Sequence, residues 1–436
     1  MRQFLCYLLL FISYLSLLSC KTTPPAQSET SVSTLTADGA WCWFSDPRAV
    51  YYEGEHKRTY VGWIDSEGNV VVSYFDHDNG QSRSHVLHEQ LEVDDHDNPA
   101  LYFTEDGRLM VFYTKHAREA PIYQMIARNP EDISNWEERR SLDLNDTTKY
   151  DGFSDTYTYV NVWPVGDQLF MLWRGADFKP NFSISEDGGQ NWSRGEILIL
   201  PERIYRNRRP YLKAYSDGSR LHLAFTDGHP HREPENSIYY AYYENGNFYK
   251  ADGSLISSLE DVPFSPAQAD LVHDGAANDK AWIWDIAADE NNDPVLTFAS
   301  FPEDSLHYYH YARWNGSDWE SERLVKAGSW FPENTPGQEQ REPNYSGGIV
   351  VDTENPDDVY LSLEKDGVFE IEHWHRRGPG DWMNRPVTMN SNKDNIRPYA
   401  VLGAKEDSPL QLFFLTNDHY THYTDYHSAV KMVLEE

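Results

Sequence analysis

The sequence of 436 residues has few cysteines and few basic residues. Its three cysteines cannot form the disulfide network that stabilises many small secreted domains. It has 37 Lys and Arg against 70 Asp and Glu, which gives a formal net charge of −33. Such a chain does not offer the basic surface through which proteins bind nucleic-acid phosphates. We therefore expect no nucleic-acid partner.

The sequence also lacks the motifs of several enzyme classes. It has no glycine-rich phosphate loop, no G-x-S-x-G turn and no cysteine–histidine nucleophile pattern. Acidic residues are so frequent that the two carboxylates of a conventional glycosidase cannot be picked out. Asp227, His229 and His231 offer oxygen and nitrogen ligands, but their spacing matches no closed zinc motif. We expect no required cofactor and predict no metal ligands, with a structural metal ion as an open alternative.

Long apolar runs are absent except at the N-terminus. Arg2 precedes an apolar run over residues 4–18, which is shorter than the about 20 apolar residues of a transmembrane helix. A run of this kind is typical of a secretory signal. It ends in Leu-Leu-Ser-Cys, which resembles the lipobox of bacterial lipoproteins, in which the cysteine is acylated. The sequence predicts a lipoprotein signal peptide over 1–20, with an ordinary signal peptide as the alternative.

This prediction sets the expected location of the protein. Cys20 would carry the lipid and anchor an exported protein at a bacterial outer membrane or cell surface. Residues 21–37 are rich in Ser, Thr and Pro and predict a flexible tether. The folded domain is then expected over residues 38–436.

Amphipathic helices of useful length are absent after residue 38. Aromatic and β-branched segments alternate there and are interrupted by Asp, Gly and Asn, a pattern typical of short antiparallel strands. A unit of strand, turn and strand recurs seven times, with turns centred near positions 67, 106, 166, 217, 291, 355 and 407. Their mean spacing of about 57 residues suits a propeller blade with long loops. The sequence predicts an all-β fold, a seven-bladed β-propeller of four-stranded antiparallel blades; an array of β-sandwiches is the alternative.

One segment supports the propeller independently. Residues 185–192 read SEDGGQNW and match the pattern S-x-D-x-G-x-x-W, the Asp-box of sialidase-like propellers. In this motif the Asp and Gly close a tight turn and the Trp packs between strands. We therefore expect Asp187 to be structural rather than catalytic.

The hairpin pattern also predicts which distant residues meet. An antiparallel hairpin brings together residues that are equidistant from its turn. His96 and His116 lie ten residues before and after Asp106, and Tyr159 and Arg174 are equidistant from the turn near 166. Each pair should lie side by side at the open end of its hairpin.

The fourth hairpin adds basic residues to this set. It should bring Arg206 and Arg208 opposite Asp227 and His229. If the blades are equivalent, the open ends of three adjacent blades lie on one face of the propeller. A cleft on that face would hold two histidines, a tyrosine and several arginines.

Such a cleft suits the abstraction of a proton next to a carboxylate. That reaction needs a base, an acid for the leaving oxygen and a cation that reduces the charge of the carboxylate. Tyr and His can exchange the protons, and Arg binds a carboxylate through two hydrogen bonds. The alternative is structural, with His96 and His116 bound to the neighbouring acids Asp94, Asp95 and Asp97.

Several segments resemble the BNR-type seven-bladed propellers. They are WCWFSDPRAVYYEG (41–54), DDHDNPALYF (94–103), TYVNVWPVGDQLFMLWRG (158–175), RPYLKAYSDGSRLHLAFTDGHP (209–230) and NSIYYAYY (236–243). Within this group the chain is most similar to the ulvan lyases of polysaccharide lyase family 25. The resemblance implies endolytic β-elimination of ulvan, a sulfated uronate-containing polysaccharide, between 3-sulfated rhamnose and glucuronic or iduronic acid, giving a 4,5-unsaturated uronate. We expect the protein to act as a monomer.

The resemblance implies roles for individual residues. His96 and His116 match the family's catalytic histidines, Tyr159 its catalytic tyrosine and Arg174 the arginine that neutralises the carboxylate. Tyr157 and Tyr159 point to the same face of the predicted strand, so Tyr157 is the alternative for the catalytic tyrosine. Substrate-binding roles are expected for Asn98, Tyr157, Arg208, Arg209, Tyr211 (with Tyr215 as the alternative) and His229.

Two questions stay open at this level. The basic run of Arg203, Arg206, Arg208, Arg209 and Lys213 either recognises sulfate and carboxylate or is paired with surface acids. The chain is alternatively a glycoside hydrolase of the α-L-rhamnosidase type acting on rhamnose–glucuronate glycans, or a glycan-binding lipoprotein without activity. An unsaturated product distinguishes the lyase from both.

Overall fold

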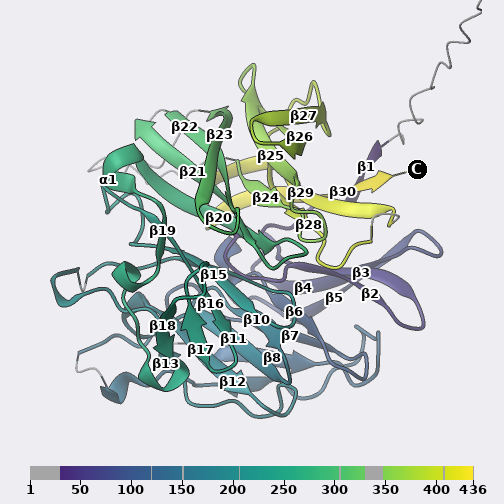
Figure 1. The fold of residues 1–436 in the computed structure, drawn as a ribbon. Helices are drawn as coiled ribbons and strands as arrows, with labels where there is room; N and C mark the ends of the chain where they lie inside the picture. The colour runs from purple at the N-terminus through teal and green to yellow at the C-terminus, as the bar shows by residue number, and fades with distance from the viewer. Residues whose placement is uncertain are drawn as a thin grey trace, which may run out of the picture.

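Seven antiparallel sheets form a ring in the computed structural model, which describes residues 30–118, 120–149, 152–205, 207–303, 306–328, 347–405 and 408–435 (Figure 1). The first strands of neighbouring sheets contact one another. The predicted seven-bladed β-propeller is therefore confirmed. The part of the chain that the structure describes contains a single short α-helix, α1 (Gly275–Asn278), and none of its helices has the length and hydropathy of a membrane span.

The first three blades follow one another directly along the chain. Blade 1 consists of β2 (Ala49–Glu53), β3 (Lys57–Ile64), β4 (Val70–Asp76) and β5 (Gln81–His88). Blade 2 consists of β6 (Ala100–Phe103), β7 (Leu109–Tyr113), β8 (Ile122–Ile126) and β9 (Arg140–Leu142). Blade 3 consists of β10 (Asn161–Val165), β11 (Gln168–Arg174), β12 (Pro180–Ser185) and β13 (Glu196–Ile197).

Blade 4 is larger than predicted, with six strands instead of four. They are β14 (Leu212–Ser216), β15 (Leu221–Thr226), β16 (Ile238–Glu244), β17 (Asn247–Tyr249), β18 (Leu255–Ser258) and β19 (Asp270–His273). Blade 5 consists of β20 (Lys280–Ala288), β21 (Pro294–Glu303), β22 (Leu306–Trp314) and β23 (Trp319–Gly328). Blade 6 consists of β24 (Ile349–Val351), β25 (Asp358–Lys365), β26 (Val368–Gly378) and β27 (Asp381–Pro386).

The two ends of the chain share blade 7, which closes the ring. Its strands, from the inside outward, are β28 (Asn395–Ala400), β29 (Leu410–His422), β30 (Asp425–Glu435) and β1 (Thr30–Thr36). In Figure 1 the purple β1 lies beside the yellow β30, and Ser31 pairs with Leu434. β1 satisfies the backbone groups at the edge of β30, which would otherwise be exposed.

This closure corrects the predicted domain boundary. Residues 30–36 are not part of a flexible tether but form the outermost strand of blade 7, so the propeller begins at residue 30 rather than 38. Ser and Thr suggested a linker by composition, whereas alternating Thr, Val and Leu also fit a strand. The predicted signal peptide, Cys20 and the first part of the tether lie outside the described residues.

Most predicted turns join the first two strands of a blade. Phe103 pairs with Leu109 around position 106, and Ala288 with Pro294 around 291. Gly107 has a φ of 79°, a conformation that glycine adopts without steric cost. The turn near 67 differs, because it joins β3 and β4, the two middle strands of blade 1. The pattern missed β2 because this strand is short and only its first residue is fully buried.

The Asp-box has the structural role that was predicted. Asp187 accepts hydrogen bonds from the Ser185 hydroxyl at 2.8 Å and from the Asn191 backbone at 2.8 Å, which closes the turn after β12. Trp192 packs edge-on against Phe112 of blade 2, with ring centroids 5.8 Å apart. The motif therefore joins blades 2 and 3.

A buried ion pair connects blade 7 to the segment before blade 2. Arg397 of β28 contacts Asp95 at 2.5 Å and donates to the Trp41 carbonyl at 2.7 Å, and both Arg397 and Asp95 are at most 1% exposed. Replacing Arg397 with methionine should lower the free energy of unfolding by about 3–5 kcal/mol, because Asp95 would remain buried without its partner. Denaturant titration measures this loss. The exposed Arg377→Met is the control, with an expected change within about 0.5 kcal/mol, and equal midpoints for both variants would contradict the prediction.

Candidate active site

The predicted residue pairs meet at the open ends of adjacent hairpins. His96 lies in a short 3-10 turn (Asp95–Asp97) before β6, and His116 lies after β7; their rings stack with centroids 4.1 Å apart. Arg174 ends β11, and its guanidinium carbon lies 4.5 Å from the centroid of the Tyr159 ring, just before β10. Equidistance from the turn thus predicted both contacts.

These groups line one pocket of about 230 Å³. Seven of the predicted residues lie on its wall: His96, His116, Tyr159, Arg174, Arg209, Tyr211 and His229. Blades 2, 3 and 4 supply them, as the equivalence of blades predicted. The pocket also contains Phe44 and Trp282, whose rings pack beside Tyr211 at 5.0 and 5.4 Å.

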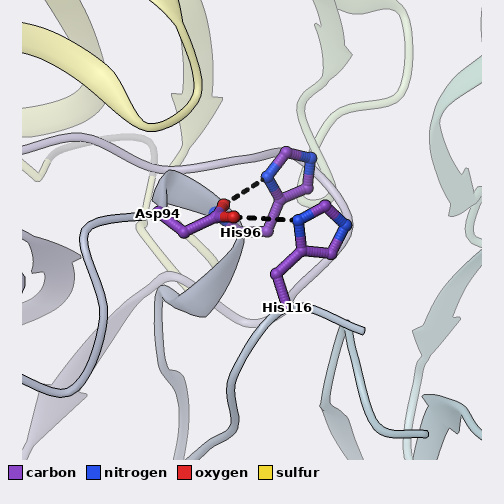
Figure 2. A group of neighbouring side chains, drawn as sticks. All are labelled: Asp94, His96 and His116. Carbon is purple, nitrogen blue, oxygen red and sulfur yellow. Dashed lines mark hydrogen bonds and ion pairs between the residues drawn. The ribbon is translucent and has the colours of Figure 1, made fainter. Parts of the chain in front are cut away.

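One carboxylate holds both histidines. Asp94 accepts from Nδ1 of His96 at 2.7 Å through one oxygen and from Nδ1 of His116 at 2.9 Å through the other (Figure 2). The two rings lie within 13° of parallel. Both histidines are thus bound to a neighbouring acid, as the structural alternative predicted. They nevertheless line the pocket.

Asp94 also sets the charge of the two rings. Burial raises the pKa of Asp94, but both histidines outweigh burial and hold it below its usual value, so the carboxylate is ionised. Burial and the charge of His96 lower the pKa of His116 to about 4 despite Asp94. Burial also opposes the charge of His96, but Cys42 and Asp94 outweigh it and raise its pKa. At neutral pH His116 is therefore neutral, with Nδ1–H bound to Asp94 and a lone pair on Nε2.

The lone pair of His116 faces a cation. Nη2 of Arg174 lies 3.4 Å from Nε2 of His116. Burial lowers the pKa of Arg174, but Tyr159 and Tyr211 more than compensate, so the guanidinium stays charged. A carboxylate bound to Arg174 would lie next to the His116 nitrogen.

Tyr159 has an unusual backbone conformation at this place. Its φ is 61°, a left-handed value that costs a non-glycine residue about 1–2 kcal/mol. The amide of Asn161 holds it there by donating to the Tyr159 carbonyl at 2.9 Å and to the Phe44 carbonyl at 2.8 Å. Burial raises the pKa of Tyr159 well above its usual value, so its hydroxyl is protonated and can act as an acid. Strain of this kind is concentrated at functional sites.

Asp94, His96 and His116 also form the one cluster of potential metal ligands among the described residues, with ligand atoms within 4.8 Å of one another. Both Nδ1 atoms are bound to Asp94, one to each carboxylate oxygen, and the two rings lie nearly parallel. The described contacts are those of a hydrogen-bonded group, and we derive no metal chemistry from it.

The propeller has counterparts among known proteins. Residues 58–327 match the model of the BNR repeat-containing family. The chain belongs to this family. No curated protein sequence matches it.

Two solved structures share most of the propeller. One is a polysaccharide lyase of family 25, an ulvan lyase bound to -[GlcA(1-4)Rha3S]-, with 13% identity, a TM-score of 0.69 and coverage of 92% of this chain and 95% of that chain. Another structure of a family 25 ulvan lyase has 13% identity, a TM-score of 0.68 and coverage of 93% and 96%. At this identity the likeness shows the fold.

Three residues of this BNR-family protein do not line the pocket, which corrects their predicted contact with substrate. Asn98 is 2% exposed, accepts from the Cys42 backbone and donates to the Ser45 carbonyl. The Tyr157 hydroxyl accepts from two backbone amides and donates to Asp143, in the segment that follows β9. Arg208 forms ion pairs with Asp227 at 2.6 Å and Glu233 at 3.0 Å. Sequence spacing placed these residues near the site but did not show which way they face.

The basic residues between 203 and 213 differ in role: some are paired with acids, and one lines the pocket. Arg208 and Lys213 are paired with acids, and Lys213 is buried against Asp46 and the Trp43 carbonyl. Arg203 is exposed on a 3-10 turn, and Arg206 lies outside the described residues. Of the described members of the run, Arg209 alone lines the pocket, with its guanidinium 3.7 Å from the Phe178 ring centroid.

Sequence reasoning missed several pocket residues, among them Arg232 and Tyr423. Arg232 stands three residues after His229 in the same loop, and the basic segment GHPHRE is the local signal that indicates it. Burial and the charges of Arg232 and Arg174 lower the pKa of Arg209, which shows how closely these cations are grouped. Tyr423 comes from blade 7 and has no local sequence signal. Tyr215, the alternative to Tyr211, packs against Trp163 away from the pocket.

Proposed function

We propose that this protein is a polysaccharide lyase that cleaves ulvan by β-elimination between 3-sulfated rhamnose and a uronic acid. One observation carries the proposal: Arg174 lies 3.4 Å from Nε2 of His116 and 4.5 Å from the Tyr159 ring centroid. A cation for the carboxylate thus adjoins two groups that can exchange protons. The shared fold with the family 25 ulvan lyases supports the same function.

The charges of the site assign the steps. Arg174 binds the uronate carboxylate and stabilises the negative charge that develops on it. Nε2 of neutral His116 takes the proton from C5, and the electrons of that C–H bond form the double bond between C4 and C5. The C4–O bond breaks, and the Tyr159 hydroxyl gives its proton to the leaving oxygen. His96 stays protonated and keeps Asp94 bound.

The remaining cations suit a second anionic group. Arg209 and Arg232 line the same pocket as Arg174. Two guanidiniums with neighbouring positive charge favour a sulfate or a second carboxylate. This supports a sulfated, uronate-containing polysaccharide as substrate.

The pocket offers little support for a glycoside hydrolase. Glu233 is the one carboxylate among the described residues that line the pocket, and it is paired with Arg208. Hydrolysis with inversion or retention normally needs two carboxyl groups across the bond. The elimination reaction needs none.

Ultraviolet absorbance tests the proposal directly. Purified protein incubated with ulvan should produce a conjugated alkene whose absorbance rises with time. Free rhamnose or new reducing ends without this absorbance would instead indicate hydrolysis. Binding of ulvan without any product would indicate a glycan-binding protein.

Anchoring by lipid at a cell surface is a separate proposal, since Cys20 lies outside the described residues. An exterior position would give the enzyme access to a polymer. Labelled palmitate should be incorporated into the full chain in a bacterial host and not into Cys20→Ser. Equal labelling of both proteins would contradict it.

A further inference from the structure

Asp94 alone does not explain why the two histidine rings lie parallel. It makes one hydrogen bond to each ring, in both cases through Nδ1. A ring held at one atom can still rotate, because the torsion between Cβ and the ring is broad. Arg174 adds a long contact of 3.4 Å to His116. His96 also approaches Asp95 at 3.2 Å through the same Nδ1, and Tyr159 packs at a tilt against both histidine rings, with centroids 5.6 and 6.1 Å apart. A contact that stands perpendicular to both rings would set their planes more firmly.

Tyr423 makes that contact with both rings. Its ring centroid lies 4.7 Å from that of His96 at an angle of 88°, and 5.2 Å from that of His116 at 76°. A ring that stands perpendicular to both members of a stack limits the rotation of each. Edge-to-face contacts between aromatic rings at such centroid distances are attractive.

Two contacts with Asp95 hold the hairpin that carries Tyr423. Tyr423 follows directly on β29 in the turn to β30, and its carbonyl accepts from the backbone of Asp95 at 3.0 Å. Tyr420, on the same hairpin, donates its hydroxyl to Asp95 at 2.5 Å. The hairpin of blade 7 is thus attached to the residue next to Asp94, the carboxylate that both rings share (Figure 2).

We propose that Tyr423 is a positioning residue whose ring keeps His96 and His116 parallel, so that Nε2 of His116 faces Arg174 and the substrate. This inference rests on the proposed lyase function. Blade 7 would then contribute a positioning residue to a site whose proton-exchanging groups come from blades 2 and 3. The aromatic ring is what acts; the hydroxyl is not required for it.

Steady-state kinetics of three variants test the proposal. Tyr423→Ala should lower kcat about 10- to 100-fold, the cost of a misplaced base, with KM within about twofold. Tyr423→Phe keeps the ring and should restore kcat to within about twofold of the original protein. His419→Ala, at an exposed position of the same hairpin paired with Asp425, is the control and should leave kcat unchanged.

Two kinetic outcomes would overturn the proposal. A raised KM with unchanged kcat in Tyr423→Ala would make Tyr423 a substrate contact. Loss of kcat in Tyr423→Phe equal to that in Tyr423→Ala would assign the effect to the hydroxyl.

A measurement without substrate separates this inference from the lyase proposal. NMR spectra of histidine-labelled protein should show shifted ring resonances for His96 and His116 in Tyr423→Ala and nearly unchanged ones in Tyr423→Phe. Unchanged resonances in both variants would refute the positioning role, whatever the activity. If the original protein makes no unsaturated product but the resonances shift as expected, the lyase proposal fails and the contact stands.

Discussion

Replacing Arg174 with alanine should reduce kcat/KM on ulvan at least about 100- to 1,000-fold, the usual cost of removing one group that stabilises transition-state charge. Arg174 is the cation next to Nε2 of His116. In the proposed elimination, the substrate carboxylate would lack its counter-charge when the C5 proton leaves. Initial rates of alkene absorbance measure the effect. Arg174→Lys keeps the charge but not the two-point hydrogen bonding, and should recover only part of the rate.

A matched arginine separates this effect from a general change in charge. Arg220 pairs with Glu244 at 2.8 Å, at the turn end of blade 4 and away from the pocket. Arg220→Ala should keep full activity, and thermal unfolding should show that the Arg174 variants are folded. Full activity in a folded Arg174→Ala protein would overturn the carboxylate-neutralising role.

Loss of either proton-exchanging group should have a similarly large effect. His116→Ala and Tyr159→Phe should each lower kcat about 100- to 10,000-fold, since each removes general acid–base catalysis. Tyr159→Phe is the more specific change, because its ring can still stack under Arg174 and beside Phe44. Single-turnover rates of alkene formation would isolate the chemical step from product release.

Tyr157→Phe is the natural control for this pair. Its hydroxyl bonds to the backbone of Leu144 and Asn145, so the change should lower stability and leave the rate of elimination unchanged. The opposite result, activity lost in Tyr157→Phe and kept in Tyr159→Phe, would move the catalytic tyrosine by two residues.

Local sequence was enough to predict the hairpins and the contacts within them. Alternating apolar residues define a strand, and Asp or Gly at a turn defines its centre, so residues equidistant from that centre must meet. This is why the sequence alone pairs His96 with His116 and Tyr159 with Arg174. The same reasoning could not predict the direction of a side chain that has no partner across a hairpin. Asn98 is an example, since its side-chain amide binds the backbone of Cys42.

Contacts between blades could be identified only in the closed ring of the tertiary structure. The sequence alone determined an all-β propeller, its seven repeats and two pairs of site residues, because these depend on patterns a few residues long. Only the tertiary structure decided that β1 completes blade 7, that one carboxylate of Asp94 joins both histidines, and that Tyr423 reaches them from the last hairpin. These contacts join residues far apart in the chain, and their geometry depends on how seven blades pack around one axis.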